Sequence, residues 1–316
     1  MNSHLTVPPL VSIVLTTYNG SSFLSEQLDS LINQSYPTIE IIAVDDRSTD
    51  DTVEILQEYA KKHSGIKVFV NEKNLGFVKN FQRGCELSSG AFIAFCDQDD
   101  YWNKEKITNL VNAIGDHHLI HSDSYICNEH LEETGKRLSD NVNYLDLNNP
   151  LQQAVFCRIY GNTILFTREL FNRATPFLEI IPHDWWLSYN ATLCGGIKYF
   201  DEPLVYYRQH GSNIYGAIGG KRNKNEQKKE KSTKRIQEKN THLMRIKKFY
   251  ALCPDAMKAE KQVLFKLTQS YRNLSFTNNC LRMVTFFSNY KLLLVVKKRS
   301  RLRNYLFCLK TFFKTI

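Results

Sequence analysis

The chain has 316 residues, and because 42% of them are hydrophobic and 23% are charged it can bury a sizeable core, which excludes global disorder. Residues 1–220 hold 16 Lys and Arg against 27 Asp and Glu, whereas residues 221–316 hold 25 Lys and Arg against 5 acidic residues. The apolar runs are far shorter than the roughly 18 residues that a membrane-spanning helix needs, and the first ten residues lack the basic stretch of a secretory signal.

Short apolar runs alternate with helical patterns over the first hundred residues. The pattern predicts strands at 11–15, 39–44, 66–70 and 91–96, and helices at 23–32, at 77–87 and from a cap at Ser48 or Thr49 to about residue 59. Strands that alternate with helices form parallel sheets, and ligands bind where the loops leave the carboxyl ends of such strands. Polar clusters follow all four strands, so we expect a binding site on that rim.

The pattern is mixed from residue 104 onward. It predicts a strand at 160–166, a helix that starts at Asp184, a strand near 197–200, and basic helical structure over 219–316. We therefore predict an α/β fold with a mostly parallel sheet flanked by helices in residues 1–218, with one half at about 10–103 and the other at about 104–218. Residues 219–316 form a basic helical extension. The eight cysteines contain no CxxC pair, and we expect them to be reduced in a cytoplasmic protein.

Three carboxylates stand within four residues after the last of these strands, at Asp97, Asp99 and Asp100. Like charges so close together resist ionisation unless a cation joins them. Mg²⁺ and Mn²⁺ prefer oxygen ligands, so the cluster predicts a divalent metal site. The alternative is a solvated acidic turn or the cap of the following helix.

Three further polar groups are candidates for chemistry. Asp46 follows the second strand and either caps a helix or accepts hydrogen bonds from a nucleotide base and its ribose. Asp184 stands before two tryptophans, where burial raises the pKa of a carboxylate and makes it a better proton acceptor; the alternative is an N-cap. His210 follows Arg208 on a short polar loop and suits a phosphate or a metal, although a lone histidine is more often an ordinary surface or core residue.

Four blocks of this sequence together resemble the family 2 glycosyltransferases of the GT-A fold. The blocks are residues 11–19 (VSIVLTTYN), 44–50 (VDDRSTD), 74–76 (NLG) and 95–102 (FCDQDDYW). The resemblance covers about residues 10–215, and it implies a Rossmann-like α/β domain that transfers a sugar from a nucleoside diphosphate with inversion at the anomeric carbon. The QxxRW motif of processive synthases is absent.

The resemblance also implies roles for single residues. Asp184 would be the catalytic base, and Asp97-Gln98-Asp99 stands where the family has its DxD motif. His210 stands near the position of a carboxy-terminal histidine that reaches the metal or the diphosphate in many GT-A enzymes. The residues implied for nucleotide binding are Thr16, Tyr18, Asp46, Asn74, Lys79 and Asp97, and those for Mg²⁺ or Mn²⁺ are Asp97, Asp99 and His210. The arginine usual before the DxD strand is missing, and Lys79 or Arg83 is the candidate replacement.

The motifs around Asp97, Asp184 and His210 also resemble a rhamnosyltransferase-type subgroup, which implies dTDP-rhamnose, or otherwise a UDP-sugar, as donor and a surface glycan as product. The basic extension carries aromatic and aliphatic residues beside Lys297 to Arg303, which fits an interfacial helix on anionic lipid and a lipid-linked acceptor at the inner face of the membrane. A solvated helical face and a nucleic-acid patch are the alternatives, and we expect no nucleic acid. Two other functions stay open at this point: a sugar-phosphate nucleotidyltransferase and a non-catalytic basic binding protein.

Overall fold

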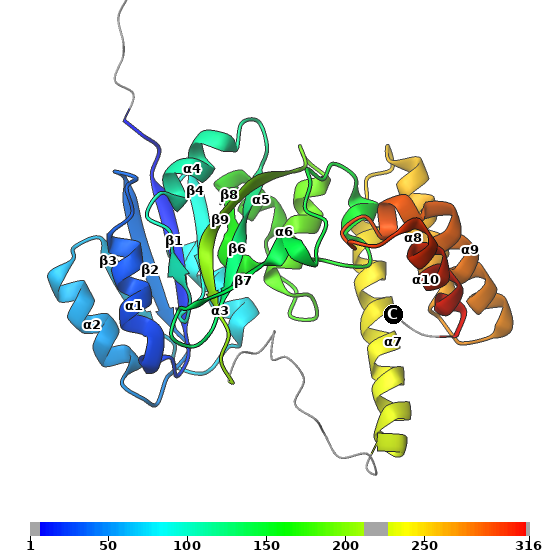
Figure 1. Cartoon of the computed structure of the whole chain (residues 1–316), viewed down its shortest axis with the longest axis horizontal. Helices are drawn as coiled ribbons and strands as arrows, with labels where there is room; N and C mark the ends of the chain where they lie inside the picture. The colour runs from blue at the N-terminus through cyan, green and yellow to red at the C-terminus, as the bar shows by residue number, and fades with distance from the viewer. Residues whose placement is uncertain (1–6, 212–226, 314–316) are drawn as a thin grey trace, which may run out of the picture.

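A computed structural model describes residues 7–211 and 227–313, and the described residues contain a nine-stranded sheet flanked by helices, with a further group of helices at one end (Figure 1). The strands lie in the order β3-β2-β1-β4-β8-β6-β9-β5, and β7 pairs with β6. Their bounds are β1 Val11–Thr17, β2 Ile39–Asp45, β3 Ile66–Val70, β4 Phe92–Cys96, β5 Tyr101–Trp102, β6 Leu119–Cys127, β7 Glu133–Arg137, β8 Ile164–Thr167 and β9 Ile197–Arg208.

The first four strands form a parallel unit, as the sequence predicts. β1 pairs in parallel with both β2 and β4, and its register places Thr17 opposite Asp45 and Leu15 opposite Cys96. The loops after these three strands therefore leave from the same edge of the sheet. Beyond β4 the sheet is mixed, because β8 runs antiparallel to β4 and β6, whereas β6 and β9 are parallel.

Helices cover both faces of the sheet, and this explains why β1 is buried on both sides. One core packs α1, α2 and α4 against the sheet, and a second core packs α3, α5 and α6 against the other face. The bounds are α1 Ser21–Ile32, α2 Thr52–Lys62, α3 Phe77–Leu87, α4 Lys106–Ala113, α5 Arg168–Ala174 and α6 His183–Thr192.

Two local predictions are wrong. α2 begins at Thr52 after Asp51, and not after Ser48 or Thr49. Ser48 does not cap the helix because its hydroxyl binds the Asp45 carboxylate and the backbone N–H of Asn19. The expected strand at 160–166 is also shorter, because Gly161–Thr163 forms a 3-10 turn and β8 starts only at Ile164.

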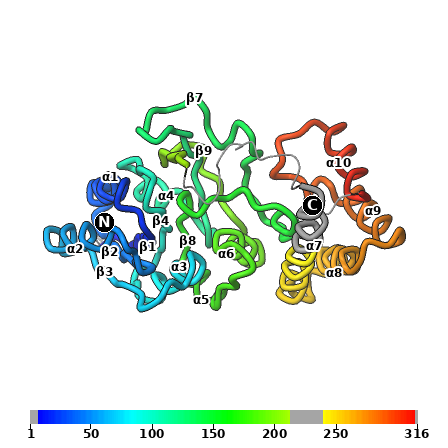
Figure 2. Tube along the Cα trace, turned by 90° about the horizontal axis from the view of Figure 1, so that it is seen from below, coloured from blue at the N-terminus to red at the C-terminus, as the bar shows by residue number. Residues whose placement is uncertain are grey.

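The C-terminal part is helical, as predicted, with α7 Gln227–Leu252, α8 Lys258–Ser270, α9 Phe276–Leu293 and α10 Arg301–Phe313. These helices gather at the end of the molecule opposite α2 (Figure 2). They share the second core with α6: the Phe249 ring lies 3.8 Å from that of Tyr189, whose hydroxyl donates to the Phe249 carbonyl. The extension is thus packed on the sheet unit, and the predicted boundary at residue 218 lies outside the described residues. None of the described helices is both long and apolar enough to span a membrane, and no cysteine forms a disulfide.

Candidate active site

The acidic turn after β4 is joined to the loop after β1. The Gln98 side chain accepts from the backbone N–H of Tyr18 at 2.8 Å and donates to the Tyr18 carbonyl at 3.2 Å. The middle residue of Asp97-Gln98-Asp99 therefore holds two rim loops together. The side chains of Asp97 and Asp99, which flank Gln98 in the chain, are both partly exposed.

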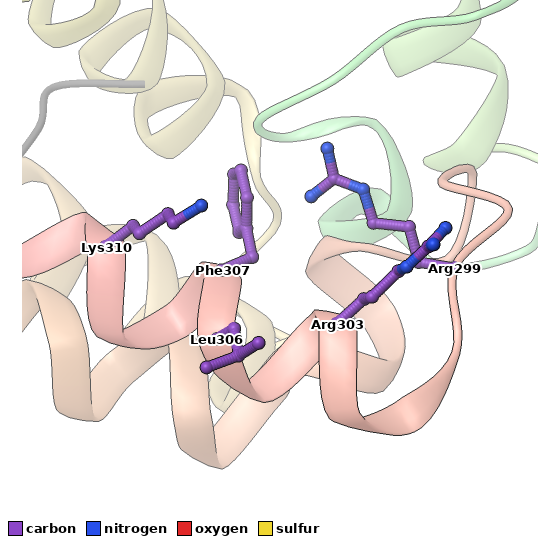
Figure 3. Close-up of a pocket in the computed structure, with 5 residues that line it drawn as sticks. All are labelled: Arg299, Arg303, Leu306, Phe307 and Lys310. Atoms are coloured by element: carbon purple, nitrogen blue, oxygen red, sulfur yellow. The ribbon is translucent and has the colours of Figure 1, made fainter.

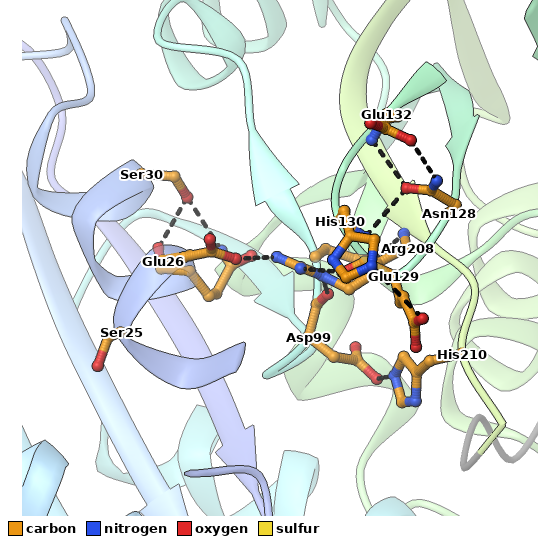
Figure 4. A network of polar contacts seen from close by, with 12 residues as sticks. Ser25, Glu26, Ser30, Asp99, Asn128, Glu129, His130, Glu132, Arg208 and His210 are labelled. Atoms are coloured by element: carbon orange, nitrogen blue, oxygen red, sulfur yellow. Dashed lines mark hydrogen bonds and ion pairs between the residues drawn. The ribbon is translucent and has the colours of Figure 1, made fainter. Parts of the chain in front are cut away.

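Asp99 and His210 come together from positions far apart in the chain. The His210 Nε2 lies 2.9 Å from Asp99 Oδ2 (Figure 4). The imidazole packs on the Phe23 ring, with the ring centroids 4.7 Å apart. The side chain of His210 is 9% exposed and that of Asp99 is 17% exposed, so the pair is mostly enclosed but still accessible. The long strand β9 explains the meeting, because it ends at Arg208 beside the acidic turn and carries His210 just beyond.

Arg208 lies next to this pair and is almost fully buried. Its guanidinium donates to the carbonyl of Asp99 at 2.8 Å and to the carbonyl of Glu129 at 2.6 Å, and it forms an ion pair with Glu26 of α1 (Figure 4). Its backbone N–H donates to Asp100. Arg208 thus fixes the backbone of the acidic turn and leaves the Asp99 carboxylate to His210.

Asp100 has a structural role that differs from that of its neighbours. It is fully buried and accepts a hydrogen bond from the Asn162 amide, while the Asn162 carbonyl accepts one from Lys106. Lys106 is buried too, with its ammonium 3.0 Å from the centroid of the Trp102 ring. Burial raises the pKa of Asp100 and lowers that of Lys106. Both side chains are thus held where their charged forms are disfavoured, and neither is exposed on the rim.

Two basic side chains, Lys106 and Arg208, approach the acidic turn. Arg208 donates to the Asp99 carbonyl, and the positive charge of Lys106 lowers the pKa of Asp97. A lone lysine at the start of a helix gives no signal that it will be buried.

The Asp97 carboxyl is held in an unfavourable environment for its charge. Burial raises its pKa to about 7, and the negative charges of Asp99 and Asp184 act in the same direction, while Lys106 opposes them. Asp184 is therefore close enough to the acidic turn to influence it, although 87 positions separate it from Asp97 in the chain. Carboxylates whose negative charges raise one another's pKa attract a cation.

Asp184 lies in the first turn of α6, where the helix dipole favours a negative charge. Burial raises the pKa of Asp184 to about 6, and a hydrogen bond from the Trp185 N–H at 2.6 Å opposes that shift. The preceding His183 is buried, and burial lowers its pKa to about 3, so it is neutral at pH 7. Its ring stacks on Phe81 at 4.1 Å, and a Cβ on Gly161 would lie only 2.8 Å from its Nε2. Glycine at 161 thus makes room for this ring, a constraint that the sequence did not reveal.

The residues implied for nucleotide binding lie along the same rim. Thr16 is partly exposed at the end of β1, and the Tyr18 side chain is 49% exposed. Asp46 is buried and accepts hydrogen bonds from the Asn71 amide and from the backbone N–H groups of Leu75 and Gly76. Asp46 therefore shapes the loop after β3 in addition to any contact with a base.

The remaining members of this group lie at the start of α3. Asn74 is exposed and accepts from the Gly76 N–H, and Lys79 donates to the carbonyl of Phe177 at 2.9 Å. Arg83, the other candidate for the missing arginine, donates to the Asn71 amide oxygen at 2.7 Å. Lys79 thus faces the segment before α6, whereas Arg83 supports the loop that Asp46 binds.

The donor groups at the rim suit a hard divalent cation. In the part of the chain that the structure describes, no three His, Cys, Asp or Glu side chains converge into a ready-made metal cage. Mg²⁺ commonly binds one or two carboxylates and completes its shell with substrate phosphates and water. The Asp99–His210 pair beside the raised-pKa carboxyl of Asp97 fits a cation of that kind.

Comparison with known proteins identifies the family of this chain. A family model described as Glycosyl transferase family 2 matches residues 12–173, more than half of the chain. The chain belongs to glycosyl transferase family 2. The matched segment contains β1 to β8 and the acidic turn, so the glycosyltransferase prediction is confirmed.

Two curated relatives have named activities. The chain is 30% identical over 210 residues to the UDP-Glc:alpha-D-GlcNAc-diphosphoundecaprenol beta-1,3-glucosyltransferase WfaP of Escherichia coli, covering 65% of this chain and 79% of that protein. It is also 30% identical over 221 residues to the dTDP-rhamnosyl transferase RfbG of Shigella flexneri, covering 64% and 74%.

Solved structures confirm the GT-A fold prediction. S. aureus TarS 1-349 in complex with UDP-GlcNAc superposes with a TM-score of 0.60 at 18% identity, over 96% of this chain and 80% of that one. The mannosyltransferase PcManGT of Pyrobaculum calidifontis, in complex with GDP-Man and Mn²⁺, gives a TM-score of 0.52 at 16% identity, over 98% and 86%.

Proposed function

We propose that this glycosyltransferase inverts the anomeric centre of a nucleoside-diphosphate sugar, with Asp184 as the base and a divalent cation at Asp99 and His210. The observation that carries the proposal is the effect of Asp184 on Asp97: the negative charge of this carboxyl on α6 helps to raise the pKa of Asp97 in the acidic turn after β4. An inverting transfer needs a base on the acceptor side and positive charge on the leaving-group side, and this arrangement supplies a place for each.

On the acceptor side, the environment of Asp184 suits proton abstraction. A sugar hydroxyl is a weak nucleophile, so a base must take its proton as the attack begins. With a pKa of about 6, Asp184 is mostly ionised at pH 7 yet accepts a proton more readily than an ordinary carboxylate. The neutral His183 beside it contributes no positive charge that would weaken the base.

On the donor side, the rim offers contacts for both ends of the nucleotide. Thr16, Tyr18, Asp46 and Asn74 are proposed to bind the base and ribose, and Lys79 is proposed to bind the diphosphate. Asp97 is proposed to contact the ribose or the cation, and Asp99 and His210 to hold the cation. When bound, Mg²⁺ or Mn²⁺ would stabilise the negative charge that develops on the leaving diphosphate.

The names of the relatives support the choice of substrates. One relative is named for UDP-glucose and a diphosphoundecaprenol-linked acceptor, and the other for dTDP-rhamnose. We therefore propose dTDP-rhamnose or a UDP-sugar as the donor and a glycan or lipid-linked glycan as the acceptor, in the synthesis of a surface polysaccharide. The proposed place of work is the cytoplasmic face of the membrane, which the enzyme would contact peripherally.

A donor panel tests the proposal. The full chain is incubated with dTDP-rhamnose, UDP-glucose, UDP-N-acetylglucosamine and GDP-mannose, with Mn²⁺ or with EDTA, and nucleoside diphosphate release is measured. We expect release from one donor, dependent on the metal and lost in Asp99→Asn. The control Asp116→Asn removes an exposed carboxylate away from the rim and should behave as wild type.

Other outcomes would contradict parts of the proposal. Release that is unchanged by EDTA would remove the cation from it. Pyrophosphate release from a nucleoside triphosphate and a sugar phosphate would instead indicate a nucleotidyltransferase. With an acceptor in hand, the anomeric configuration of the product, measured by NMR, tests inversion directly.

A further inference from the structure

Helix α10 carries a row of large apolar side chains on its exposed face. Cys308 and Thr311 face the protein, and the Thr311 carbonyl accepts a hydrogen bond from the buried Arg282 of α9 at 2.7 Å. The opposite face carries large apolar side chains at positions i, i+4, i+7 and i+11, which form one stripe on a helix. We call this the α10 stripe: Leu302 at 67% exposure, Leu306 at 47%, Leu309 at 47% and Phe313 at 70%.

A neighbouring aromatic residue lengthens the stripe. Phe276 at the start of α9 is 75% exposed, and its ring lies 5.5 Å from that of Phe312, the residue before Phe313. The apolar surface therefore continues from one helix to the next. Contiguous exposed apolar surface of this kind marks a site of contact with a partner or a membrane.

Basic side chains border the α10 stripe. Arg303 and Lys310 are exposed on one side of it and Arg301 on the other. Arg299, Arg303 and Lys310 line a surface hollow of about 320 Å³ together with Leu306 and Phe307. Figure 3 shows the Phe307 ring between the Lys310 ammonium and the Arg299 guanidinium, and the latter lies 4.7 Å from the ring.

The charged side chains of α9 and α10 all have the same sign. No Asp or Glu follows Glu260 in the chain. A protein partner with both acidic and basic side chains would find only basic side chains to pair with here. A bilayer instead offers an apolar interior and a uniform layer of phosphate groups. The combination of apolar stripe and basic border matches that surface.

We propose that the α10 stripe is a docking surface for a bilayer that contains anionic lipids. Leu302, Leu306, Leu309 and Phe313 enter the boundary between headgroups and acyl chains, and Arg299, Arg303 and Lys310 contact lipid phosphates. This inference concerns where the enzyme is held and does not depend on the donor or on the catalytic residues proposed above. It names the part of the basic extension that makes the membrane contact.

Vesicle binding by the full chain tests the proposal. Protein is mixed with vesicles of phosphatidylcholine alone or with phosphatidylglycerol added at three parts in ten, and the bound fraction is measured by flotation. We expect binding to the anionic vesicles only, and a loss of about tenfold or more in the triple variant L302S/L306S/L309S, since each leucine loses its apolar contact with the lipid.

A charge variant and a matched control complete the experiment. R303Q/K310Q should lose roughly fivefold per cation removed, because each contributes about 1 kcal/mol near an anionic surface. K61Q/K62Q removes two exposed cations from α2 at the opposite end of the molecule and should bind like wild type. Circular dichroism and nucleoside diphosphate release, unchanged in all variants, show that fold and chemistry are intact.

Two results would overturn the inference. Equal vesicle binding by L302S/L306S/L309S and wild type would show that the α10 stripe is not the contact. A dimer of the wild type in the absence of lipid, broken by the same triple variant in sedimentation analysis, would show that a second copy covers the stripe instead. Neither result bears on whether the chain transfers a sugar.

Discussion

Replacing Arg208 with methionine should weaken the fold and the donor site together. The guanidinium is buried and donates to the carbonyls of Asp99 and Glu129, and it pairs with Glu26. A net contribution of roughly 1.5–3 kcal/mol is usual for a hydrogen bond to a charged group. The Glu26 carboxylate is 57% exposed and regains water when the pair is lost, so we count only the two carbonyl bonds at the lower end. The expected loss in the free energy of unfolding is about 3 kcal/mol.

Urea unfolding followed by circular dichroism measures this loss, with an unchanged m-value as the sign of a native-like starting state. The KM for the donor should rise as well, because the backbone carbonyl of Asp99 loses its hydrogen bond from the Arg208 guanidinium. Arg173→Met is the control, because Arg173 on α5 is 56% exposed and pairs with the exposed Glu169 in the same helix. This substitution should change the free energy of unfolding by no more than about 0.5 kcal/mol. The reasoning fails if Arg208→Met and Arg173→Met have the same stability and the same KM for the donor.

Two further predictions concern charge. Glu40→Gln should lower the free energy of unfolding at pH 7 by about 3 kcal/mol. Burial alone would raise the pKa of Glu40, but hydrogen bonds from Lys67, Ser89 and Ser12 outweigh it and lower the pKa to about 2. This stabilisation is present above pH 4.5 and is lost as the pH falls through about 2, so urea titrations of both proteins should converge in acid; a constant difference would contradict the assignment. For catalysis, protonation of Asp184, with its pKa of about 6, should reduce kcat/KM about tenfold between pH 7 and pH 5, and a profile that is flat over this range would exclude Asp184 as the titrating base.

The parallel half of the fold could be predicted from the sequence because its signals are local. The short apolar runs at β1, β2, β3 and β4 and the spacing of apolar residues in α3 each depend on neighbouring residues only. Where a side chain had a distant partner, local reasoning failed. Ser48 resembles a helix cap, but it binds Asp45 and Asn19 instead, and the helix starts later.

For the candidate site, the sequence indicated that the polar blocks share one rim but not which side chains contact each other there. The polar blocks that end the parallel strands do share one rim, because the register of β1 with β2 and β4 brings their carboxyl ends together. The contact of His210 with Asp99, the support from Arg208 and the burial of Lys106 depend on the path of β9 and on the mixed half of the sheet. That half has no repeating pattern from which the pairing could be worked out.

The most direct test of the central claim is to compare Asp184→Asn with wild type in sugar transfer and in donor binding. The account places Asp184 on the acceptor side as the base, so the variant should lose about 10²–10⁴-fold in kcat while the dissociation constant for the nucleotide sugar, measured by calorimetry with Mn²⁺, stays within about twofold. Transfer at the wild-type rate by Asp184→Asn, in a folded protein, would contradict the account.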